Sequence, residues 1–131
     1  MAANILQAFN DHFFEFVKDV ENVFPNDEDI LIAKNSLITI RKANPKMIIK
    51  IWTQFVVGKY KPEIEKGDID FFINKDYSED IGDTSSSSYI TDAIDRFRSP
   101  IKQMKPDDQK KAMKYIQNLT KLADIYNYIK Q

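Results

Sequence analysis

The chain has 131 residues, of which 43% are hydrophobic and 30% charged, with a net charge of −1, no cysteine and one histidine, His12. This length predicts one domain, and the nine Phe, six Tyr and one Trp exclude a disordered acidic tail. The absence of cysteine excludes disulfide scaffolds, cysteine nucleophiles and thiolate metal sites, and it fits a reducing compartment.

The first third of the chain predicts two helices. Apolar residues recur every three or four positions from Ile5 to Phe24, which is helical spacing. Pro25 ends this helix because the residue before a proline avoids the α region. Asn26 is the expected N-cap of a second helix that ends at Ala43. The second helix should bury one apolar stripe, made of Ile30, Ala33, Leu37 and Ile40.

The middle of the chain predicts a third helix and two shorter ones. Asn44 is the expected N-cap and Pro45 the first helical residue, a position where the missing N–H costs nothing. Gly58 is the expected C-cap of this third helix. A helical turn then ends at Gly67, and a short helix is expected at about residues 68–75. The third helix should bury Met47, Ile48, Ile51, Trp52, Phe55 and Val56.

The last part of the chain predicts a loop and two helices. Residues 78–88, SEDIGDTSSSS, are polar and small, so they cannot bury enough surface to offset their ordering entropy and predict a mobile loop. Helical spacing resumes from Tyr89 to Met104, where Pro100 should kink or split the helix. Pro106 is expected to start a last long helix.

These patterns predict an all-α fold with more than half of the residues helical. No segment alternates apolar and polar residues with the β-branched enrichment of a strand. We expect a compact single-domain bundle of about five to seven helices, with residues 1–77 as an N-terminal helical array, a mobile loop at 78–88 and C-terminal helices at 89–131. The apolar stripes of both halves are too wide to leave in water, which predicts one shared core.

Charge is segregated along the chain. Residues 1–33 carry −6 and residues 63–95 carry −8, whereas residues 34–62 hold seven bases and no acid. Residues 96–131 carry +6. The basic segment 34–61 is a candidate face for a polyanion or a protein partner, formed by Lys34, Arg41, Lys42, Lys46, Lys50, Lys59 and Lys61.

The basic segment has three interpretations. Clustered lysines can neutralise the phosphates of a nucleic acid. However, a sequence pI of 5.8 and only three arginines are unlike a dedicated nucleic-acid-binding domain. Basic helices can also pack beside acidic ones so that their charges cancel. The third interpretation is a head-to-tail contact between copies. In that contact the acidic face would be Glu63, Glu65, Asp68, Asp70 and Asp76.

The sequence offers no catalytic constellation, metal site or cofactor motif. His12 has no second histidine or cysteine to complete a metal pair, and its phenylalanine neighbours indicate helix packing. Three glycines leave no nucleophile elbow, phosphate loop or dinucleotide fingerprint. Asp68 and Asp70 could ligate a hard cation, but on a helix they would be about 200° apart, so helix capping explains Asp68 better.

The sequence predicts no contact with a membrane. The first residues lack the basic and apolar regions of a signal peptide, and no apolar run is long enough to span a bilayer. We therefore expect a protein that is not secreted. Trp52, Phe55 and the flanking lysines are compatible with an amphipathic helix on a membrane surface, but such a stripe is more often part of a core.

The stretch from Asn44 to Asp80 resembles small uncharacterised α-helical proteins of nucleocytoplasmic large DNA viruses. The resemblance lies in Asn44-Pro45-Lys46, Trp52, Gly67-Asp68 and Phe71-Phe72 ahead of Asp76-Tyr77. It covers under a third of the chain and carries no catalytic motif. It implies a virus-encoded helical protein located in the virion or in the host cytoplasm or nucleus, and the abundance of Ile, Asn and Lys agrees with the A/T-rich genomes of many such viruses.

Together these observations favour a non-enzymatic protein-interaction or structural module, such as a virion or assembly component, that binds a protein partner or its own copies. The alternative is a nucleic-acid-associated protein that uses the basic segment 34–61. An enzyme is the least favoured class because no motif brings a nucleophile, a base and an activating partner together.

Overall fold

The computed structural model describes residues 2–67, 96–97 and 99–130, and within these ranges every regular element is helical. The all-α prediction is therefore confirmed. The elements are α1 (Ala2–Val23), α2 (Glu28–Ala43), α3 (Met47–Ile51), the π-helix η1 (Trp52–Val57), α4 (Gly58–Lys66) and α7 (Pro106–Lys130), together with helical residues at 99–103.

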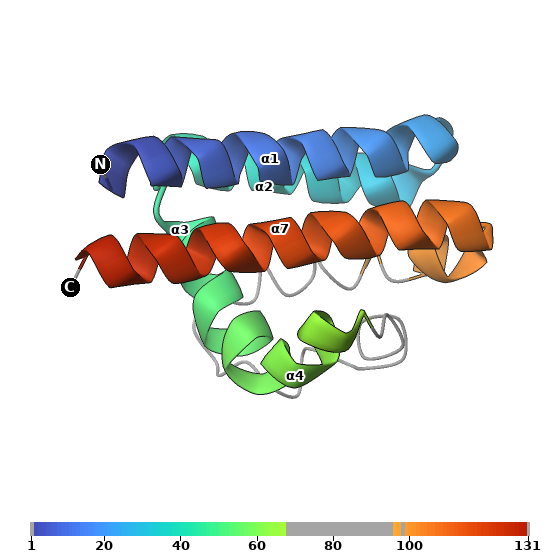
Figure 1. Cartoon of the computed structure of the whole chain (residues 1–131). Helices are drawn as coiled ribbons and strands as arrows, with labels where there is room; N and C mark the ends of the chain where they lie inside the picture. The colour runs from blue at the N-terminus through green and yellow to red at the C-terminus, as the bar shows by residue number, and fades with distance from the viewer. Residues whose placement is uncertain (1, 68–95, 98, 131) are drawn as a thin grey trace.

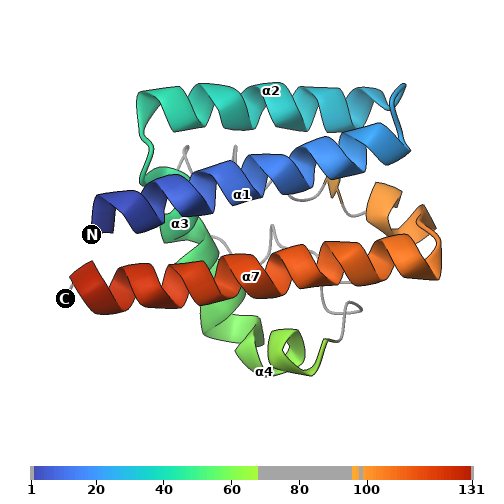
Figure 2. The ribbon, with the colours of Figure 1, turned by 45° about the horizontal axis from the view of Figure 1, so that its top comes forward.

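Two long helices, α1 and α7, form the centre of the bundle and run antiparallel, so that both ends of the chain lie at the same end of the molecule (Figure 1). Figure 2 shows α2 along the outer side of α1, away from α7. The continuous helical stretch α3–η1–α4 contacts α1 and α2 through α3. It then crosses α7 and contacts it through both η1 and α4 (Figure 2).

A single hydrophobic core joins these helices. The apolar stripe of α1 faces an apolar stripe of α7 that includes Ile116 and Leu119, both fully buried. Trp52 is only 3% exposed, and its ring meets those of Phe9 and Phe13 edge-on, at centroid distances of 6.2 and 6.1 Å. Aromatic pairs prefer this geometry because the positive edge of one ring meets the negative face of the other. Trp52 is thus a core residue, as its spacing favoured.

The first two helices end close to their predicted limits, but α1 begins at Ala2, ahead of the predicted Ile5, and a different residue caps α2. Helix α1 ends at Val23, ahead of Pro25, and α2 ends at Ala43. The predicted N-cap, Asn26, was wrong by one residue. Asp27 is the cap, because its Oδ1 accepts the backbone N–H groups of Asp29 at 2.9 Å and Ile30 at 3.2 Å. A carboxylate in this position also interacts favourably with the positive end of the helix dipole.

The connection between α2 and α3 is longer than predicted. Asn44 does cap a turn, since its Oδ1 accepts the N–H of Lys46 at 3.1 Å. However, Pro45 is not the first residue of the helix, because the helix begins at Met47, whose N–H donates to the carbonyl of Asn44 at 3.1 Å. The polar side chain therefore closes a turn, and the helix starts after it.

The predicted end of the third helix at Gly58 was wrong. Gly58 has helical φ and ψ angles of −60° and −30°, and the helical stretch continues through it to Lys66. The irregularity lies at Tyr60 (φ −122°, ψ 16°), two residues before Pro62, whose ring conflicts with the preceding turn. Gly67 ends α4 with a left-handed φ of 76°, as predicted for that glycine.

Several predictions fall on residues outside those that the structure describes. They include the short helix at 68–75, the loop at 78–88 and the start of the helix predicted from Tyr89. Pro100 is buried within helical residues 99–103, and Pro106 begins α7 as predicted. Among the described helices, none is both long and apolar enough to cross a bilayer.

Candidate functional site

Three residues of the predicted basic face are neutralised within the fold. Lys34 on α2 binds Glu21 on α1, with Nζ 3.0 and 3.2 Å from the two carboxylate oxygens. Lys61 on α4 lies 3.2 Å from Oδ2 of Asp124 on α7. Arg41 is the third and binds α1. The interpretation that basic helices pack beside acidic ones is therefore correct for these three side chains.

Arg41 makes two contacts with α1. Its guanidinium donates to Oδ1 of Asp11 at 2.6 Å and lies over the ring of Phe14, 5.3 Å from the ring centroid. A guanidinium is weakly hydrated and planar, so it can stack on an aromatic face while it binds a carboxylate. Arg41 therefore fixes the end of α2 against α1 and is less available to an external ligand.

Three other lysines of that face have no ion pair with the part of the chain that the structure describes. Lys42 at the end of α2, Lys46 in the connection and Lys50 in α3 are exposed, and none has an acidic partner among the residues that the structure describes. We call residues 41–50 the α2–α3 corner. The side chain of Lys59 lies outside the described part of the structure.

The structure describes two of the five residues of the predicted acidic face. Glu65 is exposed on α4, whereas Glu63 is half-buried, and its Oε2 is buried without a hydrogen-bond partner in the described part of the chain. The other three members, Asp68, Asp70 and Asp76, lie outside the described residues.

An apolar hollow of about 420 Å³ lies on one side of the corner. Its walls are the rings and aliphatic carbons of Phe14, Ile38 and Pro45, and two cationic side chains complete it, Arg41 and Lys42. The hollow thus combines apolar walls with positive charge, and none of the described residues that line it carries a carboxylate. Such a surface suits an apolar side chain that is flanked by acidic residues.

A second hollow, of about 410 Å³, lies on the other side of Pro45, between α3, η1 and the last part of α7. We call it the polar hollow. Its polar side chains include both Lys46 and Lys50, which lie one helical turn apart. Met47, Ile49 and Tyr126 contribute apolar surface. The polar members are Asn44, Lys46, Lys50, Thr53, Gln54 and Asn127.

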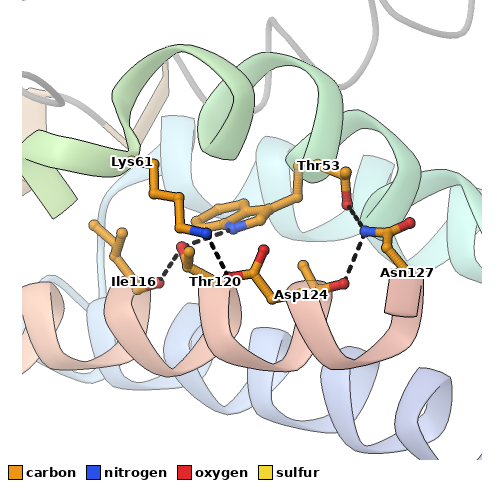
Figure 3. Close-up of polar contacts among 8 residues, drawn as sticks. Thr53, Lys61, Ile116, Thr120, Asp124 and Asn127 are labelled. Carbon is orange, nitrogen blue, oxygen red and sulfur yellow. Dashed lines mark hydrogen bonds and ion pairs between the residues drawn. The ribbon is translucent and has the colours of Figure 1, made fainter. Parts of the chain in front are cut away.

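Hydrogen bonds between α7 and η1 position the walls of the polar hollow (Figure 3). Asn127 donates both amide hydrogens, to Oγ1 of Thr53 at 2.9 Å and to the carbonyl of Ala123 at 2.8 Å. Seven residues before Asn127 in α7, Thr120 accepts the indole N–H of Trp52 at 3.3 Å and donates to the carbonyl of Ile116 at 2.9 Å. These bonds fix η1 against α7.

His12 on α1 packs against α7. Its ring lies 4.8 Å from that of Tyr115, and its Nδ1 is 3.6 Å from Oε2 of Glu15. Burial and a hydrogen bond to Asp19 raise the pKa of Tyr115 from 10.0 to about 12, so this hydroxyl stays protonated. In the described ranges, no three His, Asp or Glu side chains cluster as metal ligands would.

The sequence pattern identifies the lysines of this surface but not the apolar residues that form the walls of the hollow. Phe14 and Ile38 lie beside the core stripes of their helices, so each is only partly buried. An apolar residue beside such a stripe can mark a surface hollow. No comparable signal identifies Thr53 and Asn127, which lie 74 residues apart and meet only in the folded chain.

The chain matches no family model, no curated protein and no solved structure. The resemblance to small viral proteins therefore stays a prediction.

Proposed function

We propose that this protein is a non-enzymatic protein-binding module whose α2–α3 corner binds an acidic segment of a partner. The observation that carries the proposal is selective pairing. Lys34, Arg41 and Lys61 have acidic partners within the fold, whereas the lysines of the corner have none in the described part of the structure. Of these lysines, Lys42 lines the apolar hollow beside the paired Arg41, and Lys46 and Lys50 line the polar hollow.

The unpaired lysines supply attraction and orientation for an acidic segment. Exposed charge pairs contribute only about 0–1 kcal/mol each, so Lys42, Lys46 and Lys50 cannot hold a partner by themselves. They increase the rate of encounter with a negatively charged surface and disfavour partners that are positively charged.

The apolar hollow supplies the remaining affinity. Burial of one Leu or Phe side chain against Phe14, Ile38 and Pro45 contributes about 1.5–3 kcal/mol. The combination of an apolar pocket and adjacent cations favours an acidic peptide over a nucleic acid. A nucleic acid would need several phosphate contacts, and the chain as a whole has a net charge of −1.

Fluorescence anisotropy with a labelled peptide tests this proposal. The probe is a ten-residue peptide of Glu and Asp around a single Leu, and a second probe is a single-stranded DNA oligonucleotide of equal charge. The triple variant K42A/K46A/K50A should weaken peptide binding about tenfold or more, since three attractive charges are removed. The matched control is K105A/K110A/K114A, which removes three exposed lysines elsewhere and should bind the peptide normally.

Two results would contradict the proposal. One is equal loss of peptide binding in both triple variants, which would indicate a general charge effect. The other is tighter binding of the oligonucleotide than of the peptide, with affinity that falls steeply between about 50 and 200 mM salt, which would assign the corner to nucleic acid.

The resemblance to viral proteins suggests a virion or assembly component as the setting for such a module, located in the virion or in the host cytoplasm or nucleus. Mass spectrometry of purified virions, and of proteins that co-purify with the tagged chain from infected cells, tests this setting. Recovery from uninfected cellular material alone would contradict it.

A further inference from the structure

The polar hollow has properties that binding of an acidic peptide by the apolar hollow does not explain. It lies between α3, η1 and α7, and its volume of about 410 Å³ falls within the range of about 300–1,000 Å³ that small-molecule sites occupy. Among the described residues that line it, none carries a carboxylate. Its charged groups are Lys46 and Lys50, which are both cations and have no acidic partner among the described residues.

The hydrogen-bonding groups of the hollow are fixed by the fold. Both amide hydrogens of Asn127 are engaged, so this side chain holds Oγ1 of Thr53 as an acceptor. The hydroxyl hydrogen of Thr53 is then free to point elsewhere and to donate to a ligand. Lys46, Lys50 and Gln54 add further N–H donors around the same space.

The hollow also has an apolar part. Met47 is half-buried and lines the hollow together with Ile49 and Tyr126, which are only 1% and 6% exposed. The carbon atoms of these side chains make this part of the wall apolar. A ligand that fits this arrangement has an anionic group with several acceptor oxygens at one end and an apolar or aromatic group at the other. A phosphate monoester that carries an aromatic group has both.

We propose that the polar hollow binds a phosphate monoester, with its phosphate between Lys46, Lys50 and the hydroxyl of Thr53, and its aromatic group against Met47 and Tyr126. The proposal shares Lys46 and Lys50 with the binding of an acidic segment, but it goes beyond that function and does not depend on it. Two ligands combine a phosphate monoester with an aromatic group: a phosphotyrosine side chain of a protein, which is an aryl phosphate, and a nucleoside monophosphate, in which ribose joins the phosphate to an aromatic base.

Two-dimensional NMR of the isotope-labelled protein tests the proposal, with phenyl phosphate, phenol and inorganic phosphate as probes. Phenyl phosphate should shift the amide signals of residues 46–54 and 126–127 and should bind about tenfold or more tightly than either fragment, because only it uses both parts of the hollow. Equal binding of all three probes, or signal shifts confined to other regions, would overturn the proposal.

Variants separate the two sites. K46A/K50A should weaken phenyl phosphate binding about tenfold or more, because charge-assisted hydrogen bonds are lost, and Thr53→Val should weaken it by a smaller factor. The control K110A/K114A removes the same charge from exposed positions of α7 and should leave binding unchanged. Lys42→Ala should weaken binding of the acidic peptide and leave binding of phenyl phosphate unchanged. Weaker binding of both ligands to Lys42→Ala would overturn the assignment of the two ligands to different hollows.

Adenosine monophosphate and a phosphotyrosine peptide then identify the source of the ligand. Tighter binding of the nucleotide than of phenyl phosphate assigns the hollow to nucleotides, and tighter binding of the peptide assigns it to a phosphorylated protein. Failure of both to displace phenyl phosphate would overturn the proposal as a physiological site.

Discussion

The side-chain amide of Asn10 donates a hydrogen bond of 2.9 Å to the backbone carbonyl of Pro45, 35 residues away. Asn10 is only 2% exposed and lies on α1 among core residues. Pro45 lines the apolar hollow, and its neighbours Asn44 and Lys46 line the polar hollow. One buried amide therefore holds the connection from which both candidate sites are built.

Replacement of Asn10 by Leu should destabilise the protein and disturb both sites. The carbonyl of Pro45 would lose a part-buried hydrogen bond, and such a bond contributes about 0.5–1.5 kcal/mol. We expect this decrease in the free energy of unfolding by urea denaturation, with weaker binding of the acidic peptide and of phenyl phosphate. Asn4→Leu, at an exposed position of the same helix, is the control and should change neither quantity. Wild-type stability of Asn10→Leu would show that the bond contributes little.

The Trp52–Thr120 hydrogen bond allows a double-mutant cycle across 68 residues of sequence. Trp52→Phe removes the indole donor and part of a buried ring, and Thr120→Val removes the acceptor. Each variant should be less stable by about 1–4 kcal/mol, since both lose a buried bond and Trp52→Phe also loses packing. Thermal or urea unfolding of the single and double variants should give a coupling energy of about 0.5–1.5 kcal/mol. A coupling energy of zero would mean that the two losses are independent.

Gly58 and Gly67 should respond oppositely to replacement by Ala. Gly67 has a φ of 76°, which a side chain disfavours, so Gly67→Ala should destabilise the protein by about 1 kcal/mol. Gly58 is helical, and a Cβ there would meet the Thr53 carbonyl oxygen at 3.5 Å, an ordinary contact. Gly58→Ala should therefore stabilise the protein by about 0.5–1 kcal/mol. Urea denaturation midpoints measure both, and effects of the same sign would contradict this account.

Stability should fall at alkaline pH because of Tyr115. The pKa of this residue is about 12 in the folded protein against 10.0 for an unperturbed tyrosine. Between these values the unfolded chain loses the proton and the folded one retains it, so the stabilising contribution is complete below pH 10 and is lost as the pH rises toward 12. Urea denaturation across this range should show a smaller decrease for Tyr115→Phe than for the wild type. Identical pH profiles would contradict the assignment to Tyr115.

Local rules were sufficient to predict most of the helices. The spacing of Phe9, Phe13 and Phe16 identified the buried face of α1, and Pro106 and Gly67 marked a helix start and a helix end correctly. These predictions succeeded because helical periodicity, proline geometry and a left-handed glycine act within a few residues. Gly58 was wrong as a helix end because a glycine permits a left-handed turn without requiring one, and Pro62 determines where this helix is distorted.

The sequence by itself determined the all-α class, the core faces and the segregation of charge. Only the tertiary structure decided which charges remain available. Lys34 is paired because α2 packs on α1 beside Glu21, and Lys61 is paired because α4 crosses α7 at Asp124. Lys46 and Lys50 are unpaired because no acid lies across from them in the described part of the fold. Helix periodicity is a property of neighbouring residues, whereas an ion pair or a hollow depends on which distant helices meet. The spacing of residues along the chain does not specify which helices those are.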